Sequence, residues 1–313
     1  ASAVETMLAA EAFGRALVLE PFVPTAVMGT ALIAAGADPA VQAELLPAIA
    51  AGELKVAVAV HEPDARFDIW RVTTTARRTD GGWTLDGRKS VVIAGDSADK
   101  LIVPARTGGD VDSPEGISLF LIDAGAAGLS IRGFPTIDGL RSAEVTLANV
   151  PARAMLGGEG QGFGLLEAAV DRGIAALCAE AVGAMDRALA MTADYLNTRV
   201  QFRQPLAKFQ ALQHRVADMF AALEQARAVT LAATAGIDNP DRDARRRAVS
   251  MAKAIVGKSG RFIGEQAIQL HGGMGMSDEM DIGLYFKRLR CIDVTFGDTG
   301  HHLEQYSALM LPE

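Results

Sequence analysis

Several residue types that mark common protein classes are scarce in this sequence. Only two cysteines, Cys178 and Cys291, occur in 313 residues, and both lie inside apolar helical patterns. This argues against a disulfide scaffold and favours reduced core thiols in a cytoplasmic protein. There is no long hydrophobic run and no charged leader before an apolar segment, so we expect a soluble chain without a membrane span. The five histidines show no spacing suited to zinc, and we expect no metal site.

Positive charge and aromatic side chains are also in short supply. The formal net charge is −8 and aromatic residues make up 5% of the chain, which argues against a nucleic-acid-binding surface. An acidic protein can still bind an anion, because a local arginine or a helix N-terminus supplies positive potential. With 50% hydrophobic and 22% charged residues, the chain is typical of a folded protein large enough for two or three subdomains.

The hydrophobic pattern changes twice along the chain. Residues 1–55 predict helices, with an apolar stripe from Val4 to Leu17 and a helix start at Asp38-Pro39. Residues 56–156 predict a small antiparallel barrel or sandwich, since short β patterns recur at 56–60, 73–78, 83–85, 90–93, 101–103, 117–122 and 145–147. Glycine-rich turns at 80–82 and Asp86-Gly87 separate the early strands in this prediction.

From residue 157 to 313 the pattern is helical. A glycine-rich segment, residues 157–162, leads into long apolar stripes with short connections, which predict an antiparallel bundle. We therefore predict an α+β fold with three domains, at 1–55, 56–156 and 157–313.

Two segments have residues suited to a nucleotide. Arg199 opens the segment Arg199-Val-Gln-Phe-Arg-Gln-Pro205, and a planar guanidinium bonds two pyrophosphate oxygens at once. In Gln269-Leu-His-Gly-Gly-Met-Gly275, Gln269 offers a donor and an acceptor, and Gly272 and Gly273 let the backbone approach a ligand. Helix-ending turns explain the same residues without a ligand. Rossmann and P-loop motifs are absent from the sequence.

Taken in order, four motifs resemble those of the acyl-CoA dehydrogenase superfamily: His61-Glu-Pro63, Gly157-x-x-Gly-x-Gly-Phe163, Arg199-x-Gln-Phe-x-Gln-Pro205 and Gln269-Leu-His-Gly-Gly-x-Gly275. The likeness extends over essentially the whole chain. Segments 11–21, 95–100 and 176–183 are similar to the small subunit of pimeloyl-CoA dehydrogenase-type two-subunit enzymes. The resemblance implies N-terminal helices (incomplete here), a middle antiparallel β domain and a C-terminal four-helix bundle.

The resemblance also implies a reaction. The family oxidises an acyl-CoA to its 2,3-enoyl-CoA, as in fatty acid or dicarboxylic acid degradation, with FAD as the redox cofactor and a carboxylate as the base. The usual base is the Glu of a Tyr-Glu-Gly-Thr segment, and the matching Phe296-Gly-Asp-Thr299 holds Gly297 at that position. The family's alternative base position falls on Gly173. Asp298 is therefore the candidate base of this chain, and His301 and His302 are expected on the surface or at an interface.

The cofactor residues divide into two groups by this resemblance. Polar flavin contacts are replaced, with His61, Phe67 and Ile93 in the matching segments. Contacts that act on the FAD of a neighbouring subunit are kept at Arg199, Phe202, Gln269, Gly272 and Gly273. These five residues, together with His61 of the flavin-facing segment, are the cofactor-binding candidates. This pattern implies a supporting subunit that completes the FAD site of a large catalytic partner in an α2β2 tetramer. A homo-oligomeric enzyme that uses Asp298, and a scaffold that binds neither flavin nor acyl-CoA, are the alternatives.

Overall fold

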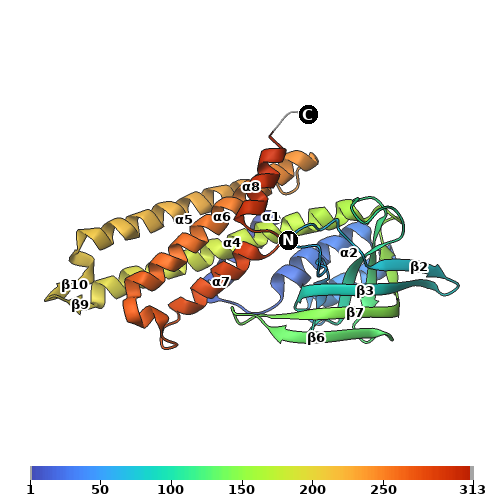
Figure 1. Cartoon of the computed structure of the whole chain (residues 1–313), viewed down its shortest axis with the longest axis horizontal. Helices are drawn as coiled ribbons and strands as arrows, with labels where there is room; N and C mark the ends of the chain where they lie inside the picture. Colours follow the sequence, from blue (N-terminus) through green and yellow to red (C-terminus); the bar gives the residue numbers. More distant parts are fainter. Residues whose placement is uncertain (1, 311–313) are drawn as a thin grey trace. The chain divides into compact units, whose positions relative to one another are not determined.

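The structure is a computed structural model that describes residues 2–310, and it divides into two compact units (Figure 1). One unit runs from Leu19 to Gly173. The other takes the chain up to Val18 and again from Ile174 onward. The helices and strands confirm the predicted α+β class. The three domain boundaries from the sequence stay a prediction.

The unit from Leu19 to Gly173 is built on an eight-stranded sheet with the order β6-β7-β3-β2-β4-β5-β8, and β1 pairs in parallel with β4. Its strands are β1(Val56–Val58), β2(Thr75–Thr79), β3(Gly82–Ile93), β4(Lys100–Arg106), β5(Ile117–Asp123), β6(Leu129–Pro135), β7(Arg141–Pro151) and β8(Ala154–Leu156). The neighbouring pairs β2–β3, β3–β7, β4–β5, β5–β8 and β6–β7 are antiparallel, which agrees with the predicted antiparallel β domain. Buried aliphatic side chains of the strands pack around Phe120 and form the hydrophobic core of this unit.

Three short helical segments belong to the same unit. They are η1(Phe22–Gly29), α2(Thr30–Gly36) and α3(Pro39–Ala50), where Pro39 opens α3 as the sequence predicts. The hydroxyl of Thr25 in η1 donates to the carbonyl of Val56 at 2.8 Å and accepts the Val56 N–H at 3.1 Å. This pair of bonds fixes η1 against the start of β1.

One sequence expectation about the strands is wrong, and two strands were not predicted. Asp86-Gly87 is no turn, because β3 continues through it and keeps pairing with β2 as far as Asp86. Gly87 instead marks a register shift between β3 and β7. The strands β6 and β8 lie outside the predicted set, because β8 has only three residues and the alternation of β6 stops at Gly133 with no fully buried side chain.

The second unit is a helical bundle. Its elements are α1(Ala3–Ala16), the larger part of α4(Gly162–Thr198), α5(Gln210–Gly236), α6(Arg242–His271), α7(Ile282–Val294) and α8(Thr299–Ala308), with the short segments β9(Val200–Gln201), β10(Gln204–Pro205), η2(Leu206–Lys208) and η3(Gly272–Met276). The long helices α5 and α6 lie side by side (Figure 1). Asp241 caps the start of α6 by accepting the N–H groups of Asp243 and Ala244.

Two glycines set the distance between α1 and α4. A Cβ added at Gly14 would lie 1.8 Å from the carbonyl oxygen of Glu180, and one added at Gly183 would lie 1.9 Å from that of Glu11. The helices are therefore in backbone contact, which no larger residue permits. Glu180 itself forms a buried two-pronged ion pair with Arg288 of α7, at 2.5 and 2.8 Å. Within residues 2–310, no helix combines the length and hydropathy needed to cross a membrane.

Candidate functional site

A strained hairpin projects from the end of α4. Its two-residue turn, Phe202 and Arg203, connects β9 to β10, and both residues have positive φ, at 52° and 67°. A type I′ turn requires this conformation, but residues other than glycine, asparagine and aspartate adopt it at a cost of about 1–3 kcal/mol each. The Phe202 side chain is 83% exposed. Strain and exposure together are typical of a residue that is held in place to contact something else.

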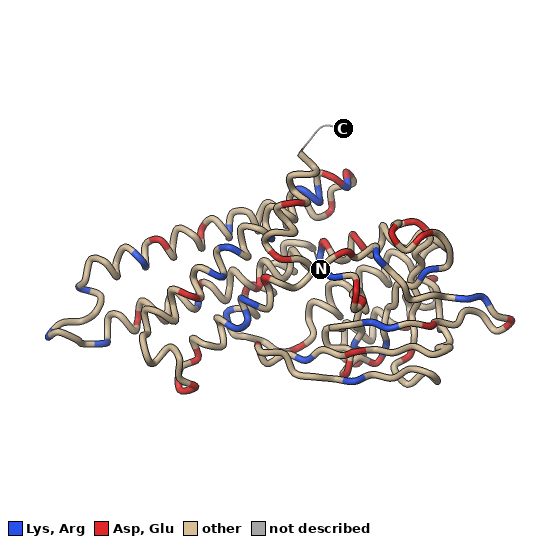
Figure 2. The backbone as a smooth tube through the Cα atoms, viewed as in Figure 1, with Lys and Arg blue, Asp and Glu red and all other residues tan. Residues whose placement is uncertain are grey.

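The same end of the bundle holds the second sequence motif. His271, the last residue of α6, stacks on Tyr195 of α4 with ring centroids 4.5 Å apart. Tyr195 lies one turn before Arg199 and accepts its N–H at 2.8 Å. The structure therefore brings Arg199 and Phe202 to the end of α6 that carries Gln269, Gly272 and Gly273. Figure 2 shows Lys and Arg residues at the hairpin.

These residues suit a bound nucleotide. Within residues 2–310, the exposed side chains of Arg199 and Gln269 make no hydrogen bond or ion pair. Gly272 has a φ of 61° and needs glycine for its backbone. Gly273 does not, and a Cβ there would meet no atom within 4 Å. Open space beside the glycine pair, with an uncommitted guanidinium and amide nearby, fits the pyrophosphate and ribose of a dinucleotide.

Sequence reasoning missed His271. It is buried, its Nδ1 pairs with the carbonyl of Ala267 at 2.8 Å, and its Nε2 has no partner. Because a carbonyl only accepts, Nδ1 carries the proton and Nε2 is a buried acceptor. Burial lowers the pKa of this imidazole. The sequence signal is a histidine placed on the apolar face of a helix just before the glycine pair.

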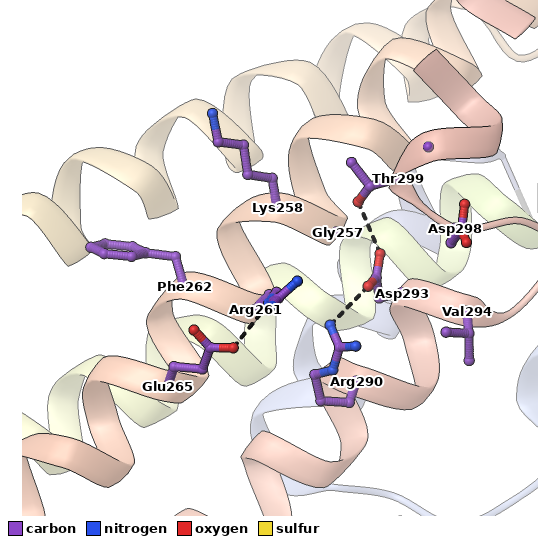
Figure 3. Close-up of a pocket in the computed structure, with 11 residues that line it drawn as sticks. Gly257, Lys258, Arg261, Phe262, Glu265, Arg290, Asp293, Val294, Asp298 and Thr299 are labelled. Carbon is purple, nitrogen blue, oxygen red and sulfur yellow. Dashed lines mark hydrogen bonds and ion pairs between the residues drawn. The ribbon is translucent and has the colours of Figure 1, made fainter. Parts of the chain in front are cut away.

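Asp298 lies elsewhere in the bundle. Its carboxylate caps α8 by accepting the N–H of His301 at 2.9 Å, and it lines a hollow of about 470 Å³ between α6, α7 and the start of α8 (Figure 3). The hollow extends along α6 from Gly257 to Glu265, and its Asp298 end lies at Gly257, which is twelve residues and about 18 Å along the helix from Gln269. The structure therefore does not bring Asp298 together with the nucleotide-type residues.

Two separate groups of hydrogen-bonded side chains line this hollow. The carboxylate of Asp293 accepts from Thr299 at 3.0 Å and from Arg290 at 3.0 Å, and Arg261 donates to Glu265 at 2.9 Å (Figure 3). Most charges in the hollow are thus already compensated. Asp298 serves there as a helix cap, which is a structural use of its carboxylate.

The turn before α8 is supported by a fully buried lysine. The Nζ of Lys253 donates to the carbonyls of Asp293 and Gly297 at 2.7 and 2.6 Å. Burial lowers its pKa to about 8, against the opposing effect of Cys178, Asp293 and Asp298. His302 is also buried, which corrects its expected surface position, and burial followed by the charge of Lys253 lowers its pKa to about 3.

His61 lies in the other unit, next to a backbone irregularity of β3. Its carbonyl accepts the N–H of Ser90 at 2.9 Å. The next residue, Val91, has a φ of 51° and is 48% exposed, where β3 shifts register against β7. A β-branched residue in this conformation is a genuine outlier. Burial, and then the charge of Lys89, lowers the pKa of His61 to about 4, so its ring is neutral at pH 7.

Glu62 anchors the segment that follows His61. Its carboxylate accepts the N–H groups of Thr73 and Thr74 at 2.7 and 3.1 Å, the Thr73 hydroxyl, and the ammonium of the fully buried Lys89 at 2.7 Å. Burial raises the pKa of this carboxyl, but the charge and hydrogen bonds of Lys89 and the threonines outweigh it and bring the pKa to about 2. Glu62 is therefore a structural anion.

Comparison with known proteins decides the family. The family model for the acyl-CoA dehydrogenase middle domain matches residues 57–150, and the model for the acyl-CoA dehydrogenase C-terminal domain matches residues 160–311. The chain belongs to the acyl-CoA dehydrogenase family. Among curated relatives, 3-(aryl)acrylate reductase of Clostridium sporogenes is 30% identical over 281 residues, or 88% of this chain and 73% of that protein. Mitochondrial isovaleryl-CoA dehydrogenase of Oryza sativa subsp. japonica is 29% identical over 265 residues, or 83% and 64%.

Solved structures agree with this acyl-CoA dehydrogenase assignment. A variant of the steroid ACAD Tcur3481-Tcur3483 superposes with a TM-score of 0.88 at 31% identity, over 98% of this chain and 81% of that chain. Butyryl-CoA dehydrogenase from Megasphaera elsdenii gives a TM-score of 0.91 at 26% identity, over 99% and 82%. The FAD complex of PigA gives 0.90 at 26% identity, over 98% and 82%. The fold, the family and its flavin cofactor predicted from the motifs are thereby confirmed.

Proposed function

We propose that this acyl-CoA dehydrogenase chain is a supporting subunit of an FAD-dependent enzyme that oxidises an acyl-CoA to the 2,3-enoyl-CoA. It binds the adenosine diphosphate half of the FAD held by a large partner subunit, in an α2β2 assembly. The partner supplies the carboxylate that removes the α-proton, and FAD, when bound, accepts the hydride. Cytoplasmic location, and a role in fatty acid or dicarboxylic acid degradation, are part of this proposal.

The observation that carries the proposal is the end of the bundle around Arg199. There an uncommitted guanidinium, an open glycine pair and a strained Phe202 gather, and the Phe202 ring is largely exposed apart from an edge-to-face contact with Phe209 at 6.0 Å between centroids. A fold that keeps about 1–3 kcal/mol of strain at each of two turn residues has that strain offset elsewhere. Binding of a ligand shared with another subunit would supply favourable contacts at Phe202 and Arg203 that offset the strain of the turn.

A second observation supports the division of roles between subunits. Position 297, which matches the family's base, is a glycine, and Asp298 caps α8. In the other unit, Val91 and the partly buried, neutral His61 occupy the segments that match polar flavin contacts. The chain thus keeps groups for the outer part of FAD and lacks those for proton removal.

Arg199→Ala tests the proposal. Charge-assisted hydrogen bonds are individually worth about 1.5–3 kcal/mol, so we expect FAD affinity of the assembly to fall by about 10- to 100-fold. Thermal unfolding of the isolated chain should not change, because the Arg199 side chain makes no bond within residues 2–310. The matched control is Arg132→Ala, an exposed arginine of β6. Calorimetric titration of the assembly with FAD measures the difference, and equal affinity in both variants would remove Arg199 from the cofactor site.

A further inference from the structure

The turn at residues 296–298 has a backbone that accepts only glycine at its centre. Phe296 has a φ of 57° and Gly297 a φ of 112°, and the second value is strained for any residue with a side chain. A Cβ at position 297 would also lie 2.6 Å from Cδ2 of His301 and 2.7 Å from Nε2 of His302. Both distances are far shorter than van der Waals contact. The space that a side chain at 297 would need is occupied by imidazole.

His302 has no freedom to move away. Its Nε2 donates to the carbonyl of Phe296 at 3.0 Å, because a carbonyl only accepts. Its Nδ1 is then an acceptor, and it pairs with the hydroxyl of Ser250 on α6 at 3.3 Å. The ring is buried, so any rotation breaks both bonds without replacing them by bonds to water.

Lys253 holds the turn from the other side. Its ammonium, fully buried, donates to the carbonyl of Gly297 at 2.6 Å and to that of Asp293 at 2.7 Å. If the turn relaxed to admit a Cβ, the Gly297 carbonyl would move away from Lys253. The buried ammonium would then have one hydrogen bond fewer. Hydrogen bonds to charged groups are among the strongest in proteins, so this relaxation is disfavoured.

We propose that Lys253 and His302 form a lock that closes position 297 to every side chain. The loss of the base in this chain is thus built into the packing of α6 and α8, and a carboxylate introduced at 297 alone does not become a base. The lock rests on contacts within the bundle. Only its catalytic meaning rests on the proposed function, through the match of Gly297 to the family's base.

Thermal unfolding tests the lock with the smallest possible side chain. Gly297→Ala combines overpacking with backbone strain, and we expect the Tm to fall by about 5–10 °C. The control is Gly300→Ala in the first turn of α8, where the nearest atom to a new Cβ is 3.4 Å away and the Tm should stay within about 2 °C. In a His301→Ala/His302→Ala background, the effect of Gly297→Ala should be roughly halved, because both rings that a Cβ at 297 would meet are removed and only the backbone strain remains. An effect of Gly297→Ala no larger than that of Gly300→Ala would overturn the lock.

Flavin reduction tests the catalytic consequence. The assembly with FAD is mixed anaerobically with a saturated acyl-CoA, with Gly297→Glu or the uncharged Gly297→Gln in this chain. We expect the same flavin reduction in both, since neither side chain reaches a substrate. Faster reduction with Gly297→Glu than with Gly297→Gln would overturn the inference, yet leave the FAD-binding role intact. If Gly297→Glu does not fold, the unfolding comparison above still decides. An absence of FAD from every preparation would remove the proposed function without touching the lock.

Discussion

The buried ion pair of Glu62 and Lys89 gives the most quantitative prediction for the sheet. Lys89→Met keeps the aliphatic volume and removes the ammonium, so that the Glu62 carboxylate is left buried with hydrogen bonds only from Thr73 and Thr74. Breaking one side of a buried pair typically costs about 3–5 kcal/mol, because an uncompensated charge remains. Since Lys89 is fully buried and Glu62 nearly so, screening by water does not reduce this figure much.

The pH dependence has a definite sign. In the native chain the pKa of Glu62 is lowered to about 2, so its contribution to stability is complete above about pH 4.5 and is lost as the pH falls toward 2. Without Lys89, burial raises the pKa of Glu62, and the variant then regains stability as the pH falls through that raised value. The pKa of His61 rises as well, because the charge of Lys89 helps to lower it. Both changes shrink the difference between variant and native chain at acid pH.

Urea unfolding at pH 7 and pH 5 measures this directly. We expect Lys89→Met to lower the free energy of unfolding by about 3–5 kcal/mol at pH 7 and by less at pH 5. The double variant Glu62→Gln/Lys89→Met should recover much of the loss, since replacing both charges is often close to neutral. A loss below about 1 kcal/mol, or one that grows as the pH falls, would refute this account of the pair.

Two further predictions concern the bundle. Gly14→Ala should destabilise the chain by about 1–3 kcal/mol or more in urea unfolding, because its Cβ would meet the backbone of Glu180. The control Gly164→Ala, whose Cβ would meet nothing within 4 Å, should be neutral or slightly stabilising. Similar effects of the two variants would contradict the backbone contact between α1 and α4. Phe202→Gly should change the stability of the isolated chain by less than about 1 kcal/mol, since relief of the left-handed φ is offset by loss of the edge-to-face contact with Phe209. FAD binding by the assembly should weaken, and unchanged FAD affinity would remove Phe202 from the cofactor site.

The sequence predicted the elements whose signals are local. The helix that begins at Pro39 and the apolar strands β4 and β5 lie where proline placement and hydrophobic patterning predict them, although Asp38 makes no capping hydrogen bond with its side chain. The hairpin β9–β10 was missed, because its turn uses Phe202 and Arg203 where glycine or asparagine would mark a type I′ turn. Asp86-Gly87 is the opposite case. Its sequence is typical of a turn, but it lies inside β3, where strand pairing with β2 outweighs the local turn preference.

The candidate site was predictable only in part. Arg199, Phe202, Gln269, Gly272 and Gly273 stand in motifs that the family match supports, and the structure gathers them at one end of the bundle. Their role in FAD binding stays a prediction. The buried side chains behind the site were not predictable, because lysine and histidine are mostly exposed in proteins and only tertiary packing puts Lys253 and His302 inside.

The flavin content of the purified chain, alone and co-expressed with a large acyl-CoA dehydrogenase subunit, tests the supporting-subunit role most directly. Visible absorption gives the ratio of FAD to chain, and anaerobic addition of acyl-CoA shows whether the flavin is reduced. We predict substoichiometric FAD in the chain alone, full occupancy in the assembly, and turnover that survives Asp298→Asn. One tightly bound FAD per chain without a partner, reduced by acyl-CoA in a reaction that Asp298→Asn slows by about 10²–10⁴-fold with the fold preserved, would contradict the account and identify a self-sufficient enzyme.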